Sequence, residues 1–262
     1  MRKLKLILST GLLFLASCLV WSQNYLVMYE VVFKPTKNDT LTERSRHVLA
    51  VNPLEKQSLY MGMSTDDPLN MMVRKDFKAN TFYKYEYLSH ILYRTDYEFP
   101  AKWMLKNETR TVNGYECQKA ETTYGGRTWE AWYSKDIPVP DGPYKFSGLP
   151  GLILEVYSKD QDYQFTLISL ERKEGRPIFQ PTAIPFAHPE KEKEFKMAVV
   201  ADPTLPGRKA RAQMASQNMS ATVTFNGKEI TAKDSDRIAI EAFEKWTAKY
   251  NNPIEQDMIW LK

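Results

Sequence analysis

Cysteine and histidine are scarce in this sequence, and their scarcity excludes several kinds of site. The 262 residues include two cysteines, Cys18 and Cys117, and three histidines. No CxxC pair is present, and His47, His90 and His188 stand apart without the HExxH or HxH spacing that places two imidazoles on one metal ion. A metal centre built from these residues is therefore not predicted.

Catalytic signatures are also missing. The sequence contains no GxSxG turn for a hydrolase serine, no GxxxxGK[ST] phosphate loop and no dinucleotide-binding glycine fingerprint. Acidic pairs at 66–67, 160–162 and 234–236 lie in turn-like or helix-start contexts, and an isolated pair supplies too few oxygen ligands for Ca²⁺. We therefore predict no catalytic residue, no cofactor and no metal, and the balance favours a protein that is not an enzyme.

Long apolar runs are absent after the first two dozen residues. Arg2, Lys3 and Lys5 precede the apolar segment LILSTGLLFLASCLVW, a layout typical of a secretory signal peptide. We predict a signal peptide at residues 1–22, followed by an exported chain that is not integral to the membrane and works in the periplasm or outer envelope.

The same segment offers an alternative cleavage site. The tetrapeptide LASC resembles a lipobox, in which case Cys18 would carry lipid. The apolar LVW that follows favours the soluble product, with cleavage after Ser22 or Gln23.

A strong net charge is missing as well. Of 36 basic and 32 acidic residues, three basic ones belong to the signal peptide, which leaves 33 against 32. A nearly neutral chain lacks the clustered basic charge that nucleic-acid binding needs. Once Cys18 is removed, Cys117 has no partner for an intramolecular disulfide, and its strand-like context, GYECQKAET, predicts a buried thiol.

Aromatic residues are what the sequence has in excess. Six Trp, 15 Tyr and 12 Phe make up 13% of the chain, and they concentrate between residues 81 and 165. Such rings either pair across the strands of a core or line a concave face that holds an apolar or peptide-like ligand. The candidates for a ligand or partner surface are Tyr115, Trp129, Trp132, Tyr133 and Tyr157.

Strand patterns dominate the first two thirds of the chain. Residues 24–34 predict a strand, residues 46–64 and 152–172 predict hairpins, and residues 81–134 predict an antiparallel meander. Helical patterns follow at 187–202, 205–219 and 235–253, with Ser235 able to cap the last helix.

These patterns predict an α+β fold: a mostly antiparallel, curved β-sheet whose C-terminal helices cover part of one face. No Gly/Ser-rich linker marks a boundary, so residues 23–262 are expected to form a single domain.

The stretch SGLPGLILEVY, residues 147–157, is the most unusual local feature. Pro150 and Gly151 fit the centre of a type II turn, and several prolines stiffen residues 137–151. The apolar residues of the turn then either plug the core or form an exposed patch. The structural motif consists of Gly148, Leu149, Pro150, Gly151, Leu152 and Ile153.

Residues 114–158 closely resemble the GLPGLI family of exported proteins from Bacteroidetes. The resemblance rests on the hexapeptide at 148–153, on YECQKA at 115–120, on Arg127, on AWY at 131–133 and, outside this stretch, on NPIE at 252–255. It implies an exported protein without an established activity, so no catalytic residue is transferred. Some members occur beside TonB-dependent transporters, which is a context and not a mechanism, and an outer-membrane protein partner is one of the two partner classes that we consider.

The leading hypothesis is a non-enzymatic envelope protein that binds an apolar or peptide-like ligand or an envelope partner. The alternative is a structural or interaction module of a transporter-associated outer-membrane complex, with residues 137–157 as its docking surface. An enzyme would require distant residues to meet in the fold, for instance Lys119, Arg127, Asp136 and Glu155.

Overall fold

A computed structural model of the chain describes residues 23–37, 40–64, 69, 71–88, 91–98, 102–219, 223–225 and 227–256. The predicted signal peptide at 1–22, including Cys18, lies outside the described residues.

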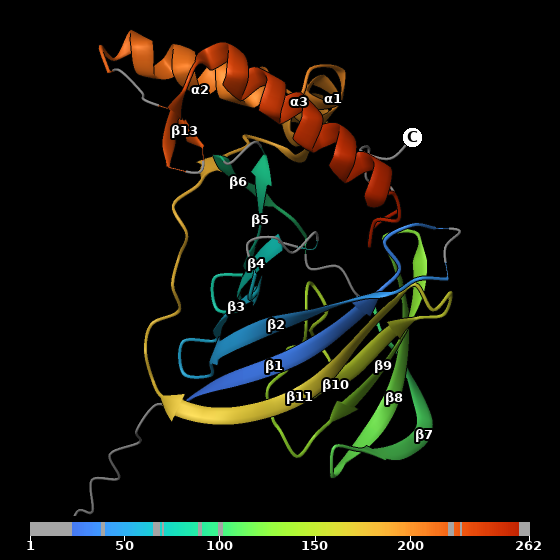
Figure 1. Cartoon of the computed structure of the whole chain (residues 1–262). Helices are drawn as coiled ribbons and strands as arrows, with labels where there is room; N and C mark the ends of the chain where they lie inside the picture. The colour runs from blue at the N-terminus through green and yellow to red at the C-terminus, as the bar shows by residue number, and fades with distance from the viewer. Residues whose placement is uncertain are drawn as a thin grey trace, which may run out of the picture.

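One open, strongly curved sheet of 12 strands forms the body of the molecule (Figure 1). All neighbouring strands pair antiparallel except β12 and β6, which pair parallel. This architecture confirms the predicted fold class. The strands are β1 (Gln23–Phe33), β2 (Glu43–Asn52), β3 (Gln57–Gly62), β4 (Met71–Asp76), β5 (Thr81–Leu88), β6 (Ile91–Asp96), β7 (Met104–Val112), β8 (Tyr115–Tyr124), β9 (Arg127–Ser134), β10 (Leu152–Ser158), β11 (Tyr163–Glu174) and β12 (Ile184–Pro185).

The strand order is β12-β6-β5-β4-β3-β2-β1-β11-β10-β9-β8-β7. Two meanders, β1 to β6 and β7 to β11, are therefore joined side by side through the pairing of β1 with β11. The prediction of one meander over residues 81–134 is wrong, because β6 and β7 follow each other in sequence but lie far apart in the strand order. Local patterning specifies strands; it does not specify which distant strand becomes the neighbour.

Alternation along the strands defines two faces of the sheet. Val27, Tyr29, Val31 and Phe33 of β1 are all buried on the concave side, which we call the inner face, and the residues between them point to the outer face. Cys117 is buried, as predicted, and burial raises the pKa of its thiol to about 11, which keeps it protonated at neutral pH.

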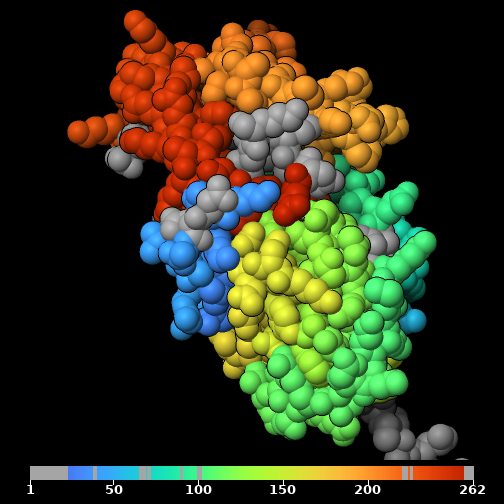
Figure 2. Space-filling model, turned by 90° about the vertical axis from the view of Figure 1, so that its right-hand side faces the viewer, coloured from blue at the N-terminus to red at the C-terminus, as the bar shows by residue number. Residues whose placement is uncertain are grey.

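Three helices, α1 (Pro189–Ala201), α2 (Leu205–Ser216) and α3 (Ala232–Lys249), gather over the β5–β6 end of the sheet (Figures 1 and 2). Phe186 and Phe195 pack on Tyr93 of β6, with ring centroids 5.0 and 5.2 Å away. Within the described residues, none of these helices is long and apolar enough to cross a membrane.

All three predicted helices are confirmed, but the cap of the last one is corrected. Thr231, rather than Ser235, is the N-cap of α3, and its hydroxyl accepts a hydrogen bond from the Asp234 amide at 3.1 Å. A short hairpin of β13 (Val223–Phe225) and β14 (Lys228–Ile230) precedes α3 and was not predicted.

Candidate functional site

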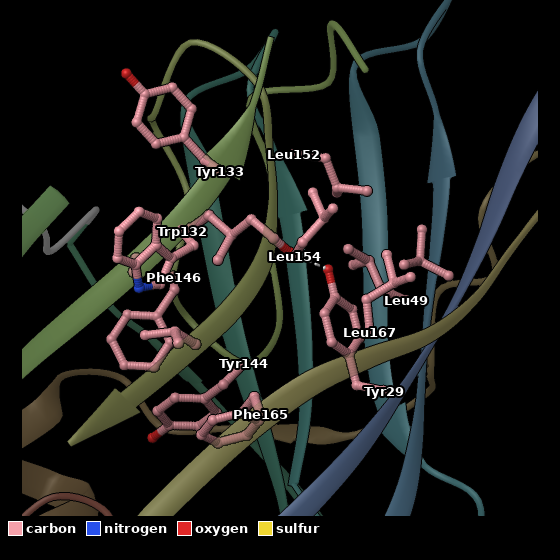
Figure 3. Packing of buried hydrophobic residues seen from close by; sticks show 14 of the residues in the cluster. Tyr29, Leu49, Trp132, Tyr133, Tyr144, Phe146, Leu152, Leu154, Phe165 and Leu167 are labelled. Atoms are coloured by element: carbon pink, nitrogen blue, oxygen red, sulfur yellow. Dashed lines mark hydrogen bonds between the residues drawn. The ribbon is translucent and has the colours of Figure 1, made fainter. Parts of the chain in front are cut away.

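The motif segment, residues 137–153, leaves the end of β9, crosses the inner face and returns as β10. Its apolar side chains lie in the main core (Figure 3): Phe146 and Leu149 are each 1% exposed, and Ile153 is fully buried. The Phe146 ring lies 4.7 Å from Trp129 and 6.2 Å from Phe165, measured between centroids. The segment therefore fills the part of the concave face that an apolar ligand would otherwise use.

The turn at Pro150 differs from the predicted type II turn. The Gly151 amide donates to the Leu149 carbonyl at 2.8 Å, which closes a three-residue γ-turn around Pro150. The Leu152 amide donates instead to Ile137, at 3.0 Å. A Cβ built on Gly151 would lie 2.0 Å from the Ser134 carbonyl oxygen, so glycine is required here by the close approach of β9.

A buried ion pair anchors the motif segment to β4. The Lys75 ammonium donates to Asp141 Oδ1 at 2.5 Å and to the carbonyls of Gly142 and Phe146 at 2.8 and 3.3 Å. Both charged side chains are almost fully buried. Burial lowers the pKa of Lys75, and the neighbouring Asp141 carboxylate opposes that shift. The pair thus fixes the path of residues 141–146 across the inner face.

An ionic network lies where the motif segment, the sheet and α1 meet. It consists of Lys84, Glu86, Lys145, Glu192, Lys196 and Glu255. Lys84 contacts Glu192 at 2.7 Å, and Lys196 of α1 contacts both Glu86 and Glu192, at 2.6 and 2.5 Å. Alternating charges therefore join β5 to α1 in a closed ring.

Lys145 and Glu255 form a separate ion pair beside this ring, and the charge of Lys84 acts on both of them. The Lys145 ammonium donates to Glu255 at 2.6 Å and to the Tyr124 hydroxyl at 2.8 Å. The rings of Tyr97, Tyr124 and Tyr144 surround it at 4.9 to 5.5 Å. Burial lowers the pKa of Lys145, and the Glu255 carboxylate opposes that shift. Buried, pKa-shifted groups of this kind also occur in purely structural networks, and here all six charges are paired with one another.

The pH dependence of stability tests this network. Burial alone would raise the pKa of Glu192, but Lys84 and Lys196 outweigh it and hold the pKa at about 2, below the ordinary 4.5. Glu192 therefore stabilises the fold above about pH 4.5, and this contribution is lost as the pH falls toward 2. We expect Glu192→Gln to lower the free energy of unfolding at neutral pH by about 2 kcal/mol and to flatten its decline below pH 4.5.

Urea denaturation between pH 2 and 7 measures this effect. Glu194→Gln is the matched control, because Glu194 lies on the same helix with a side chain that is 63% exposed and, within the described part of the chain, pairs only with Lys191. Equal pH profiles for the two variants would contradict the role assigned to Glu192.

The C-terminal segment, residues 250–256, is held by Arg127 of β9, whose side chain is fully buried. The guanidinium donates to Asp160 and Asp162 in the β10–β11 turn and to three acceptors of the C-terminal segment, the Asn252 side chain and the carbonyls of Pro253 and Ile254. The NPIE sequence is therefore a structural tie between the end of α3 and the β8–β9 hairpin.

The outer face of β7–β10 carries a second cluster, which we call the outer patch. It consists of Arg110, Lys119, Glu130, Trp132, Glu155 and Tyr157. The Arg110 guanidinium carbon lies 4.2 Å from the centroid of the Trp132 ring and its head group pairs with Glu155. Glu130 accepts hydrogen bonds from Tyr157 and from Trp132, the latter at 3.3 Å, and pairs with Lys119 at 2.9 Å.

The five aromatic residues predicted as a binding surface divide between the two faces. Trp129 and Tyr133 are fully buried on the inner face, whereas Trp132 and Tyr157 belong to the outer patch. Tyr115 is half-buried at the start of β8. The period of two along β9 explains this division, because Trp132 lies between two residues that point the other way.

The four residues that an enzyme would have to bring together remain apart. Lys119 and Glu155 share the outer patch but pair with different partners. Arg127 donates its hydrogen bonds to the C-terminal segment and the β10–β11 turn. Asp136 is exposed, just before the motif segment. Among the residues that the structure describes, no group of three potential metal ligands occurs.

Sequence reasoning did not single out the Lys75–Asp141 pair, Lys145 or Arg110. Asp141 and Lys145 lie within DGPYKF, beside the recognised hexapeptide, so a charged residue inside an otherwise apolar and proline-rich stretch was an available signal. Their partners on β4 and in the C-terminal segment lie 66 and 110 residues away in sequence and carry no such mark.

One family model, for a family of unknown function, matches part of this region. A family model described as "Protein of unknown function (Porph_ging)" matches residues 122–155, which run from the end of β8 through β9 and the motif segment into β10. This range includes the hexapeptide at 148–153, so it is compatible with the GLPGLI resemblance. No curated protein matches the chain.

Among solved structures, two crystal forms of one larger protein share the fold. Two crystal forms of PNGF-II match with TM-scores of 0.53 and 0.52 at 17% and 18% identity, over 66% of this chain. The chain spans only about a third of the length of PNGF-II, 32% and 33% in the two forms. An uncharacterized conserved protein from Thermus thermophilus matches at 8% identity over 64% of this chain and 91% of its own, with a TM-score of 0.39. At these identities the PNGF-II likeness shows the fold alone.

Proposed function

We propose that the protein is an exported, non-catalytic binding module that contacts an envelope protein through the outer patch. The observation that carries this proposal is the position of Trp132, which belongs to the main core cluster and is 7% exposed, yet lies on the outer face of β9 with the Arg110 guanidinium stacked over its ring. Trp, Tyr and Arg are the residues that most often dominate the energy of protein interfaces. The outer patch combines all three.

The packing of the inner face supports a protein partner over a small apolar ligand. Phe146, Leu149 and Ile153 occupy the concave side as part of the main core, and the Lys75–Asp141 pair holds them there. A small apolar ligand at this position would have to displace the motif segment. A partner on the outer face needs no such rearrangement.

The outer patch has two basic and two acidic side chains, and such a pattern of charges favours a specific protein partner. Arg110 pairs with Glu155 and Lys119 with Glu130, and the Arg110 side chain is 42% exposed. Moving Arg110 aside would uncover the Trp132 ring for a partner, while the remaining charges fix the orientation of binding.

The alternative docking surface at residues 137–157 has one observation in its favour. Pro138, Pro140 and Pro150 are exposed while their apolar neighbours are buried, so they form a pre-shaped, rigid strip at the surface. The same experiment can separate the two surfaces.

Site-specific photo-crosslinking in the native host tests the proposal. A photoreactive residue in place of Glu108, which is 59% exposed and 3.7 Å from Lys119, should give one discrete protein adduct. The matched control replaces Lys173, which is 58% exposed on β11, and should give none. Adding Arg110→Ala to the Glu108 probe should reduce the adduct about tenfold, whereas Arg172→Ala, from an exposed arginine stacked on Tyr25, should not change it.

Three other outcomes are informative. An adduct from a probe at Pro138 but not at Glu108 would support the alternative surface. Equal adducts from the Glu108 and Lys173 probes, or no adduct at any position, would contradict binding at the outer patch.

A further inference from the structure

Three hydrogen-bond donors on the outer face of β4–β6 have no acceptor. They are the Tyr85 hydroxyl and the Nε atoms of Arg74 and Arg94, which are buried atoms without a hydrogen-bond partner among the described residues. Arg74 is 6% exposed and Tyr85 is fully buried. Buried donors are normally satisfied, so three in one cluster require an explanation.

The strand register brings these donors together. Arg94 of β6 lies directly opposite Tyr85 of β5, and Arg74 of β4 lies opposite Tyr83, two residues away from Tyr85 on the same face. The Arg94 guanidinium carbon is 4.6 Å from the centroid of the Tyr83 ring. Burial raises the pKa of Tyr85, and the charges of Arg74 and Arg94 act in the opposite direction, which places both guanidinium groups near the phenol.

The nearby carboxylates do not use these donors. Asp76 and Asp96 approach Arg74 and Arg94 only to 3.9 and 3.8 Å, too far for a hydrogen bond. Asp76 already accepts from the Gln57 side chain and from two backbone amides of the following turn. The Asp96 side chain is 69% exposed, so water screens its charge.

We propose that this cluster is a binding site for a small oxyanion, a carboxylate or phosphate group, held by Arg74, Tyr85 and Arg94. A guanidinium with a free Nε–H offers two parallel donors to one carboxylate or phosphate, and the phenol offers a third direction of approach. The site is separate from the outer patch, so it neither depends on the proposed function nor supports it.

A proline-rich linking segment, residues 175–188, controls access to this site. It runs from the end of β11 to α1 (Figure 1), and its Ile178 packs against Leu59, Met72 and Tyr85. Phe179, the next residue, is 67% exposed. Entry of the anion therefore requires residues 178–183 to lift from the sheet, and the bound anion would then be covered by them.

Thermal unfolding of the full mature chain tests the proposal with defined probes. Sodium acetate and sodium phosphate, compared with sodium chloride at equal ionic strength, should raise the Tm of the wild type by about 3 °C, because a ligand that binds only the folded state stabilises it. Tyr85→Phe and Arg94→Gln should each weaken the binding of the anion about tenfold and abolish most of the increase in Tm. A shift with only one of the two anions would identify the chemical class.

Two comparisons separate binding from a general loss of stability. In chloride, Tyr85→Phe should melt at or above the wild type, because it removes a hydroxyl that has no partner. Tyr163→Phe removes a hydroxyl that donates to the Asn252 carbonyl, so it should melt lower in every salt and keep the full anion shift. A wild type that melts equally in all three salts, or a shift that survives both Tyr85→Phe and Arg94→Gln, would overturn the proposal.

Discussion

Gly151→Ala is expected to lower the free energy of unfolding by about 2–4 kcal/mol. The added methyl group would lie 2.0 Å from the Ser134 carbonyl oxygen, 2.6 Å from its carbon and 3.0 Å from the Lys135 nitrogen. All three are backbone atoms, so the clash cannot be relieved by turning a side chain. The end of β9 and the start of β10 would have to separate. Urea denaturation of the purified protein measures the loss.

Gly207→Ala is the matched control for this substitution. Gly207 lies in the first turn of α2, and the nearest atom to its added Cβ is the flexible end of Arg211, 3.4 Å away. Alanine there should leave stability unchanged or raise it by about 0.5 kcal/mol. A Gly151→Ala protein as stable as the wild type would show that β9 and β10 are not held as described. If such a protein also lost the crosslinked partner, the motif would have to be treated as an interface.

Arg127→Met is expected to cost about 3–5 kcal/mol, because it leaves buried acceptors and the Asp162 carboxylate with fewer partners. Methionine keeps much of the side-chain volume but none of the hydrogen bonds to Asn252, Pro253 and Ile254. Hydrogen exchange of the amides of residues 251–256 should accelerate more than that of β1, since the C-terminal segment loses its tie to the hairpin.

Arg44→Met controls for the removal of an arginine as such. Arg44 pairs with Glu30 at 2.9 Å, but its side chain is 68% exposed, so its loss should change stability little. Unfolding midpoints that shift equally for the two variants would contradict the structural role of Arg127.

Much of the local structure could be predicted because local patterns encode it. The helices and the hairpins β2–β3 and β10–β11 follow from periodicity and turn residues that lie within a few positions of one another. Two of the wrong predictions concern single turns and caps. The γ-turn at Pro150 and the Thr231 cap each replaced a local assignment that was reasonable for the residues concerned.

The candidate sites were less predictable than the fold. Trp132 and Tyr157 stood among the predicted aromatics, but Trp129 and Tyr133 stood beside them, and only the register of β9 assigns each residue to a face. Arg74, Tyr85 and Arg94 carried no signal at all, since their importance lies in hydrogen bonds that they do not make. A missing hydrogen bond can be recognised only once the packed structure shows that the donor is buried without an acceptor.

The sequence by itself determined the strand-rich character of the body, the helical end and the low net charge. Each of these depends on composition or on residues close together in the chain. The tertiary structure decided which strands are neighbours, which face each aromatic residue joins and why Gly151 must be glycine. These depend on contacts between β1 and β11, between Lys75 and Asp141 and between Gly151 and Ser134, and no local propensity specifies the distant partner.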